Sequence, residues 1–311
     1  MSMHLLEHAT RTIAAGSKSF ATASLLFAPA TRRSALMLYA WCRHCDDVID
    51  GQTLGLPASS PSLAENNALQ RLARLKMMTH RAFSGELLRE PAFAAFQEVV
   101  FRHNLSRQLA FQHLEGYAMD VRGERFQTLD DTLRYCYHVA GVVGLMMAQI
   151  MGVEKESALD RACDLGLAFQ LTNIARDIIE DAENNRCYLP LNWLQDAGLS
   201  ADNYATLSQR PALTRVAQRL LNEAERYYNS ARSGISALPL RSAWAVASAL
   251  AVYRQIGINI RKVGDNAWSE RIHTQKLEKI ALLVIGAGNT IASRAISYPP
   301  REKGLWQRPR G

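Results

Sequence analysis

Proline, glycine and strand-like alternation are all scarce in this chain, and their scarcity bears on its fold class. Only 10 Pro and 18 Gly are spread over 311 residues, and long stretches are rich in Ala, Leu, Arg and Gln. These stretches lack the alternation of β-branched and polar residues that typifies strands. With 48% hydrophobic and 21% charged residues, the chain has the balance of a globular protein with a large core. We therefore expect an all-α fold.

Cysteine is also sparse. The five cysteines are an odd number and lack the spacing of a disulfide framework, so we do not expect structural disulfides. The N-terminus lacks the basic and then apolar pattern of a secretory signal. Both absences lead us to expect a reducing, cytoplasmic location. The segment Cys42-Arg43-His44-Cys45 has no second Cys pair and no strand context, so we interpret it as two small thiols on a buried helix rather than a zinc or redox site.

Long apolar runs are missing as well. The longest uncharged run of note, Val139–Val153, covers about 15 residues, whereas a membrane-spanning helix needs about 20. This run also contains Gly141, Gly144 and Gln149. We therefore expect a buried core helix here.

The charge balance is basic. Lysine and arginine (36) outnumber aspartate and glutamate (29), which gives a net charge of +7 and a pI near 9.3. Such a surplus suits anionic partners, namely nucleic acid, anionic lipid headgroups or diphosphates. No zinc finger, RNP signature or basic heptad region accompanies it, so nucleic acid is not an expected partner. The charge instead favours attraction to a membrane surface combined with phosphate binding.

Helical periodicity continues along most of the chain. It covers Arg32–Asp50, Ala64–Ser84, Pro91–Arg102, Ser106–Asp120, Asp131–Met151, Glu156–Asp181, Leu213–Leu238, Leu240–Val263 and Thr274–Ala295. We expect residues 1–298 to form one catalytic domain and the basic tail 299–311 to be loosely ordered. A basic tail around Trp306 can touch a bilayer or have no role at all.

The first chemical signal is the acidic cluster that ends at Asp50. On a helix that turns about 100° per residue, Tyr39, Arg43, Asp46 and Asp50 fall within an arc of about 60°. Apolar residues surround this polar stripe, which indicates a largely buried helix. Asp47 points about 100° away from Asp46, so it is the weaker candidate for a shared role.

A second stripe of the same kind lies roughly 130 residues further along. Here Gln170, Asn173, Asp177 and Asp181 fall within an arc of about 80° on an otherwise apolar helix. Two carboxylates one turn apart repel each other, and burying them unpaired costs several kcal/mol more. A positive charge is therefore expected between them.

Two kinds of positive charge could satisfy the stripes. Arginines such as Arg43 and Arg176 could neutralise the acids in salt bridges. Alternatively, Mg²⁺ or Mn²⁺ could bind the carboxylates and complete its shell with water and phosphate oxygens. Because two stripes repeat the same design, we favour a metal over the salt bridges. Bound metal would turn a diphosphate into a leaving group, and the remaining cavity should exclude water.

Four stretches carry a resemblance to a known family. They are Gly16-Ser17-Lys18-Ser19-Phe20 with Tyr39-Ala40-Trp41-Cys42-Arg43 and the first Asp cluster; Gly116 to Asp120 with Tyr135-Cys136-Tyr137-His138-Val139-Ala140-Gly141; Gln170 through Asp181; and Arg186-Cys187-Tyr188-Leu189-Pro190. In order and spacing they resemble the squalene and phytoene synthase family, and within it the bacterial phytoene synthases. The resemblance implies a single-domain, all-α isoprenoid synthase helical bundle with a central cavity.

The resemblance also implies roles for individual residues. It implies that Asp46, Asp50, Asn173, Asp177 and Asp181 bind Mg²⁺ or Mn²⁺ and, through the metal, the diphosphates. It also places Tyr39 and Arg43 in the catalytic site. Substrate contacts are implied for Ser17, Ser19, Phe20, Arg43, Gln170, Tyr253, Arg271 and Lys276. For the serines, helix capping is the alternative. His138 stands where relatives often have a Tyr close to the cation, so it is either a catalytic group or a hydrogen-bonded core residue.

The implied reaction is a prenyl transfer. Two molecules of geranylgeranyl diphosphate would condense head to head through a cyclopropyl diphosphate to phytoene, the first committed step of carotenoid synthesis, without NADPH. The alternative is a synthase that joins two farnesyl diphosphates to dehydrosqualene or squalene. Because substrate and product both carry long hydrocarbon chains, we expect peripheral association with the inner membrane and neighbouring carotenoid-pathway enzymes as partners.

Overall fold

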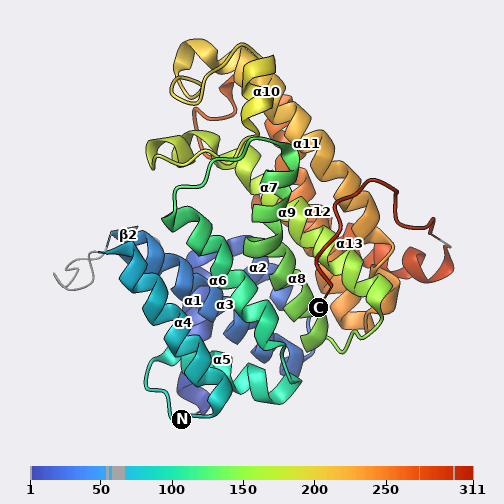
Figure 1. Cartoon of the computed structure of the whole chain (residues 1–311). Coiled ribbons are helices and arrows are strands. Elements are labelled where there is room, and N and C mark those ends of the chain that lie inside the picture. The colour runs from blue at the N-terminus through green and yellow to red at the C-terminus, as the bar shows by residue number, and fades with distance from the viewer. Residues whose placement is uncertain (1, 54–55, 58–66, 273, 297, 311) are drawn as a thin grey trace.

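The computed structural model describes residues 2–53, 56–57, 67–272, 274–296 and 298–310 (Figure 1). Its longer helices are α1 (Ser2–Gly16), α2 (Lys18–Ser24), α3 (Pro29–Asp50), α4 (Ala68–Ser84), α5 (Pro91–His103), α6 (Arg107–Val121), α7 (Leu129–Cys136), α8 (Val142–Ile150), α9 (Glu156–Glu183), α10 (Leu191–Asp196), α11 (Arg210–Arg232), α12 (Leu240–Val263) and α13 (Lys276–Ala295). A two-residue antiparallel pair, β1 (Gln52–Thr53) with β2 (Leu56–Pro57), is the one strand pairing among the described residues. The expected all-α fold is confirmed.

Most expected helices are present with ends shifted by a few residues, and α12 has the expected bounds. The sequence interpretation missed α1, α2 and α10. Helix α2 begins after Ser17, because the Ser17 side chain caps it by accepting a hydrogen bond from the backbone N–H of Phe20 at 3.2 Å. Part of the expected start of the helix Ala64–Ser84 lies outside the described residues.

The expected helix Asp131–Met151 is wrong as a single element. It begins earlier, at Leu129, because Thr128 and Asp131 form a reciprocal capping box. It is then interrupted by a π-helix, η2 (Tyr137–Gly141), before α8 continues it. A π-turn contains more residues per turn than an α-helix and therefore rotates the side chains that follow it. The side chains of α8 are therefore rotated relative to those that one continuous α-helix would present.

Two hydrophobic cores flank a central cavity. One core is built mainly by α1 and α3–α6, where Trp41 stacks on Phe96 with ring centroids 4.0 Å apart. The other is built mainly by α7–α12 and includes the fully buried Leu167 and Leu171. Figure 1 shows the blue-to-cyan helices of the first core on one side and the green-to-orange helices of the second on the other. The cavity is lined from both sides, by α2, α3, α6, α8, α9 and α12 among others.

Close helix packing fixes α9 against its neighbours. A Cβ atom on Gly166 of α9 would lie 2.4 Å from the backbone oxygen of Ala140 in η2. A Cβ atom on Gly144 of α8 would lie 2.4 Å from the backbone oxygen of Ala162. Both positions therefore require glycine, since any side chain would push the helices apart. The polar stripe of α9 is held at a fixed distance from η2 and α8 as a result.

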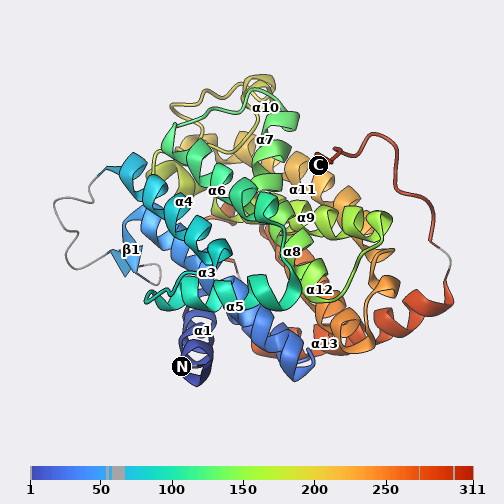
Figure 2. The same ribbon diagram turned by 60° about the horizontal axis from the view of Figure 1, so that its bottom comes forward.

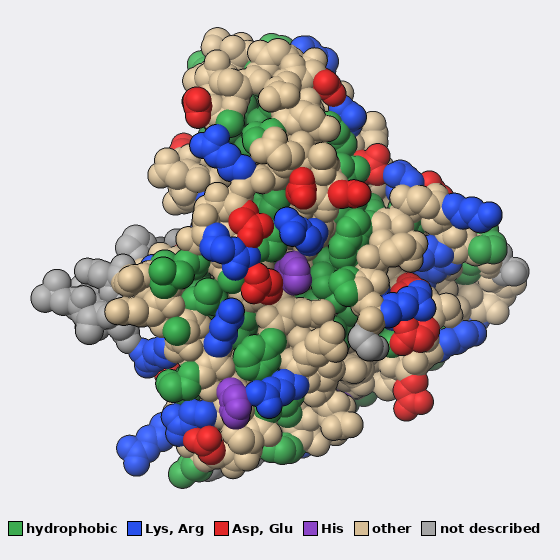
Figure 3. Space-filling view, viewed as in Figure 1, with side chains coloured by type: hydrophobic (Ala, Val, Ile, Leu, Met, Phe, Trp, Pro, Cys, Tyr) green, Lys and Arg blue, Asp and Glu red, His purple; other side chains and the backbone are tan. Residues whose placement is uncertain are grey.

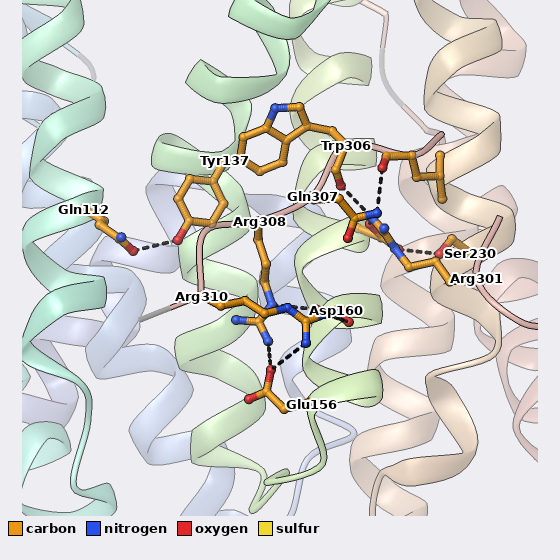
Figure 4. A network of polar contacts seen from close by, with 12 residues as sticks. Gln112, Tyr137, Glu156, Asp160, Ser230, Arg301, Trp306, Gln307, Arg308 and Arg310 are labelled. Atoms are coloured by element: carbon orange, nitrogen blue, oxygen red, sulfur yellow. Dashed lines mark hydrogen bonds and ion pairs between the residues drawn. The ribbon is translucent and has the colours of Figure 1, made fainter. Parts of the chain in front are cut away.

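The C-terminal tail was expected to be loosely ordered, but it packs against α9 and α11 (Figure 4). We call residues 298–310 the C-terminal strap. Arg301 donates two hydrogen bonds, at 2.9 and 2.7 Å, to the fully buried carboxylate of Asp164. The backbone N–H of Trp306 donates to the Tyr227 hydroxyl at 3.1 Å, and the indole ring lies 5.2 Å from the ring of Tyr137.

The basic residues at the end of the strap are also paired. Arg308 donates to Asp160 at 2.7 Å and to Glu156, and Arg310 donates to Asp160 at 2.9 Å. All of these acids lie on the first turns of α9. The composition of the tail did not indicate these acidic partners, because they lie 148 to 152 residues earlier in the sequence.

Among the described residues, no helix is long and apolar enough to cross a bilayer. The run Val139–Val153 instead contributes the buried Val142, Leu145 and Met146, as expected for a core helix. On the face seen in Figure 3, basic and acidic side chains are intermixed and do not gather into a patch of one sign. The basic surplus of the chain is therefore not concentrated on this face.

Candidate active site

The central cavity has a volume of about 940 Å³. This is at the upper end of the roughly 300–1,000 Å³ that small-molecule sites occupy. One part of its wall is charged, and the charged or amide side chains there are Arg43, Asp46, Asp120, Gln170, Asn173, Arg176, Asp177, Asp181, Arg186, Arg271 and Lys279. The remainder is lined mainly by apolar side chains, together with Arg161. The cavity can therefore hold a molecule with an anionic head and a long hydrocarbon chain.

The first wall comes from the C-terminal half of α3. Asp46 faces the cavity, and its side chain is 42% exposed to that space. Arg43 donates to Asp46 at 3.0 Å and forms an ion pair with Asp47 at 2.9 Å. Asp47 is buried and does not line the cavity, which agrees with its expected direction. Tyr39 lines the cavity one turn before Arg43, with its ring 5.6 Å from that of Phe20.

The second wall comes from the C-terminal half of α9. Asn173, Asp177 and Asp181 follow one another along the cavity side of this helix, as their spacing predicts. Arg176 forms two hydrogen bonds with Asp177, at 2.8 and 2.5 Å. Arg271 approaches the same carboxylate at 3.4 Å. Asp177 is thus paired twice, whereas no hydrogen bond or ion pair of the Asp181 carboxylate is found among the described residues.

A third set of side chains was not assigned a role from the sequence. Asp120, from the end of α6, accepts hydrogen bonds from the hydroxyls of Tyr135 at 3.2 Å and Tyr188 at 2.9 Å. The two tyrosine rings stack with centroids 4.5 Å apart. Arg186, two residues before Tyr188, lines the cavity and forms an ion pair with Asp50. The sequence signal existed, since both Gly116–Asp120 and Arg186–Pro190 belong to the stretches that resemble the family.

The cavity carboxyls hold their protons more tightly than ordinary acids do. Burial, followed by repulsion from Asp50, raises the pKa of Asp46 to about 6. Burial and repulsion from Asp177 raise the pKa of Asp181 to about 8. Burial raises the pKa of Asp120 to about 6, opposed by Arg186. Several acids are therefore crowded into one desolvated space.

The arginine alternative is partly realised, because Arg43, Arg176, Arg186 and Arg271 pair with the acidic stripes. In the described part of the chain, no three His, Cys, Asp or Glu side chains come close enough together to share a metal ion. Mg²⁺ does not need such a cage, since it commonly takes one or two protein carboxylates, waters and substrate phosphate oxygens. The donor set fits that pattern, because carboxylates from α3 and α9 line the same cavity.

The apolar part of the cavity follows α9 toward its N-terminus. Val143 and Met147 from α8, Leu165 from α9 and Val246 from α12 line it. From Ala162 to Asp177 the rise of the helix is about 22 Å, at 1.5 Å per residue. The cavity touches both ends of this stretch. It is therefore long enough to hold an extended chain with its head at the acidic stripes.

Most residues expected to contact substrate are brought together here. Ser17, Ser19, Phe20, Tyr39, Arg43, Gln170, Tyr253 and Arg271 all line the cavity. Their individual roles remain predictions. Asp50 does not line it, but it contacts Arg186, which does. The side chain of Lys276 lies outside the part of the chain that is described.

His138 is not brought to the cavity. Its Nδ1 lies 2.8 Å from the backbone oxygen of Gln112, and its own backbone oxygen lies 3.1 Å from Nδ1 of His113. The following residues of η2, Val139 and Ala140, line the cavity instead. Of the two possibilities left open by the sequence, the hydrogen-bonded core residue is the one that this geometry supports.

Comparison with known proteins agrees with this architecture. The family model for squalene/phytoene synthase matches residues 13–278. This chain belongs to the squalene/phytoene synthase family. It is 60% identical over 305 residues to a 15-cis-phytoene synthase of Pantoea ananas, with 98% of each chain covered. A 15-cis-phytoene synthase of a Paracoccus species is 50% identical over 300 residues, with 96% of each covered.

Solved structures share the fold of this family member. A dehydrosqualene synthase in complex with a ligand superimposes with a TM-score of 0.82 at 25% identity, covering 94% of this chain and 98% of that one. A squalene synthase from Alicyclobacillus acidocaldarius superimposes with a TM-score of 0.73 at 23% identity, covering 85% and 95%. The all-α isoprenoid synthase fold expected from the sequence is confirmed.

Proposed function

We propose that this protein is a prenyltransferase that joins two geranylgeranyl diphosphates head to head to give phytoene, with release of two diphosphates. The observation that carries the proposal is 60% identity to phytoene synthases over nearly the whole chain. The structurally similar dehydrosqualene and squalene synthases are only 25% identical or less. The phytoene reading is therefore favoured over condensation of two farnesyl diphosphates.

The cavity supports a reaction between two diphosphate esters. Its arginines, Arg43, Arg176, Arg186 and Arg271, can donate hydrogen bonds to diphosphate oxygens. Its apolar walls can bind the two hydrocarbon chains and keep water away from the carbon that becomes cationic. The positions of the charged and apolar parts would place both heads near the acidic stripes. Such placement brings the reacting carbons together.

We propose Mg²⁺, or Mn²⁺ in its place, as the cofactor, and no NADPH. The residues that would hold the metal are Asp46 and Asp50 of α3 with Asn173, Asp177 and Asp181 of α9. When bound, the metal would draw charge from the diphosphate and make it a better leaving group. Arg176 and Arg271, which pair with Asp177, can also donate hydrogen bonds to a diphosphate bound there.

The proposed reaction proceeds through a cyclopropyl diphosphate and ends with loss of a proton. A hydride donor is therefore not required. The polar groups Tyr39, Tyr253 and Gln170 line the cavity and can orient the chains or accept hydrogen bonds from water. We assign no step of the reaction to His138, because its ring is hydrogen-bonded to the backbone oxygen of Gln112.

We further propose that the protein works in the cytoplasm, peripherally attached to the inner membrane, beside other enzymes of carotenoid synthesis. The proposed substrate and product are amphipathic and apolar, respectively, and the net charge of +7 suits an anionic surface. The location is tested by fractionating cells at low salt. Recovery of all the protein in the supernatant would contradict it.

Chain length is tested by parallel incubation of the purified protein with geranylgeranyl or farnesyl diphosphate. We expect kcat/KM for the C20 substrate to exceed that for the C15 substrate by at least tenfold. The reason is that the longer chain contacts more of the apolar wall. If farnesyl diphosphate gives a C30 hydrocarbon and the C20 substrate gives no hydrocarbon, the function is the alternative condensation of two farnesyl diphosphates.

A further inference from the structure

The last helix, α13, has its large apolar side chains on the outside. Leu277, Val284 and Ile291 are 81%, 68% and 71% exposed. Ile280 and Ile285 are also exposed, at 59% and 50%. We call these five residues the outer face of α13. Their spacing of three, four and seven residues places them along one side of the helix.

The side of α13 that packs on the protein is instead small and polar. Gly286, Thr290 and Ser293 are buried there. A Cβ atom on Gly286 would lie 2.3 Å from Oγ and 2.9 Å from the backbone of Ser248, so α13 and α12 approach closely at this point. The hydroxyls of Thr290 and Ser293 donate to backbone oxygens one turn back, at 2.8 Å each. Small residues and the buried Leu282 thus attach the helix, whereas most of its large aliphatic side chains point outward.

The outer face has no protein covering it among the described residues. The helix packs against α12 and the short 3-10 helix η4 (Ile235–Ala237). Figures 1 and 2 both show α13 at the edge of the molecule. Contiguous exposed apolar surface on a folded protein is unfavourable in water and typically marks an interaction site.

The position of α13 connects the outer face to the cavity. Lys279, in the first turns of α13, lines the cavity. So do Arg271, Ile272 and Thr274, which immediately precede the helix. A partner that contacts the outer face would therefore lie next to the charged part of the cavity, where the head of the substrate is expected.

We infer that the outer face of α13 lies in the interface of a lipid bilayer, where the amphipathic substrate enters the cavity and the apolar product leaves it. The inference rests on the proposed function for its substrate, but its test is independent. A bilayer fits better than a polar partner because the five side chains of the outer face are aliphatic and residues 280–293 carry no charge. Arg261 and Lys262, at the end of α12, add charge that suits anionic headgroups.

This surface differs from the one that composition indicated. The basic strap around Trp306 was the sequence candidate for a bilayer contact. Its Arg301, Arg308 and Arg310 are held by acids of α9, and its indole ring packs on Tyr137. These side chains of the strap are therefore already paired within the protein, whereas the apolar side chains of the outer face of α13 are exposed.

The test is flotation of the full-length protein with vesicles. The vesicles contain phosphatidylcholine and phosphatidylglycerol at 7:3, with pure phosphatidylcholine in parallel. The test variant carries Ile280→Gln, Val284→Gln and Ile291→Gln. The matched control carries Leu69→Gln, Leu87→Gln and Leu207→Gln, which are comparably exposed apolar positions elsewhere. Size-exclusion chromatography with light scattering gives the mass of each protein in solution.

We expect the α13 variant to bind vesicles at least tenfold more weakly than the unmodified protein, and the control to bind normally. Unmodified protein that does not float, or an α13 variant that floats normally, would overturn the inference. A change from dimer to monomer in the α13 variant, with vesicle binding unchanged, would instead assign the face to a second copy of the chain.

Activity with substrate in detergent micelles separates this inference from the proposed function. We expect the α13 variant to retain micellar activity, because the substitutions lie on the outside of the helix. If neither the unmodified protein nor the α13 variant forms a hydrocarbon, but vesicle binding still depends on the outer face of α13, the condensation proposal fails and the surface assignment stands.

Discussion

Arg186 joins the two acidic stripes, because it lines the cavity beside Asp181 and forms a two-pronged ion pair with Asp50 on α3. The longer of its two contacts with Asp50 measures 3.4 Å. Arg186 also lowers the pKa of Asp120 and Asp181, against the larger effect of burial. One side chain outside both stripes thus acts on Asp50 of the first stripe, on Asp181 of the second and on Asp120.

The Arg186→Gln variant should lose activity by at least a hundredfold. Without the charge of the Arg186 side chain, Asp50 loses its ion-pair partner and the diphosphate loses a hydrogen-bond donor. The two losses together cost several kcal/mol. Steady-state kinetics measure the effect. Arg81→Gln, which breaks an exposed pair with Glu86, is the control and should be within twofold of the unmodified protein. Equal activity of the two variants would contradict a role for Arg186.

Asp46 and Asp47 are adjacent but face different surroundings, so they make a matched pair. Asp46→Asn should reduce kcat by about a thousandfold, as expected for a metal ligand, while Asp47→Asn should reduce it less than tenfold. Asp47→Asn should instead lower the Tm, because it weakens a buried ion pair with Arg43. Assays over a range of Mg²⁺ concentrations separate the two effects.

A readout without turnover tests the same metal site. Mg²⁺ and inorganic diphosphate together should raise the Tm of the unmodified protein, because they bind only the folded state. This shift should be absent in Asp46→Asn and present in Asp47→Asn. Chelation by EDTA should abolish both the shift and the activity. An equal shift in both variants would remove Asp46 from the metal site.

The strap should contribute to stability through the buried pair between Arg301 and Asp164. Arg301→Met leaves a fully buried carboxylate without its main partner, which should cost about 3–5 kcal/mol. Replacing both residues, Arg301→Met with Asp164→Leu, should recover much of that loss, since no unpaired charge then remains. Denaturant unfolding measures both. A loss below 1 kcal/mol in the single variant would mean that the strap is not held as described.

Stability should fall in mild acid because of His113. Burial lowers the pKa of this imidazole to about 4, from an ordinary value near 6.5. Between these two values the unfolded chain binds a proton that the folded chain does not, so stability falls as pH falls from about 6.5 to 4 and is unaffected above. The full effect is about 3 kcal/mol.

The control for this effect is His113→Gln, which cannot titrate. The Tm difference between the unmodified protein and this variant should shrink as the pH is lowered from 7 to 5. A difference that stays constant over this range would show that His113 does not titrate as described. His113 bonds to the Tyr117 hydroxyl at 3.2 Å, so the variant will be less stable at neutral pH.

The two stripes could be predicted from the sequence because helical periodicity alone places them. Asp46 and Asp177 lie on single helices, so the 3.6-residue repeat suffices to orient each toward one side. The set around Asp120 could not be found this way. Its members come from α6, α7 and the segment after α9, and they meet only through tertiary packing.

Two outcomes have local physical causes. His138 was one of two open possibilities because relatives often have a Tyr close to the cation at this position, and the structure places its ring against the backbone oxygen of Gln112. The strap was expected to be loose because basic tails usually are, yet its partners Glu156, Asp160 and Asp164 are remote in sequence. Composition cannot reveal such long-range pairs.

The most direct test of the proposed function is mass spectrometry of the products formed from geranylgeranyl diphosphate and Mg²⁺ by the purified protein without NADPH. We expect a C40 hydrocarbon with the mass of phytoene and two diphosphates released for each molecule of it. The absence of any C40 hydrocarbon, or a C40 product that forms only when NADPH is added, would contradict the account.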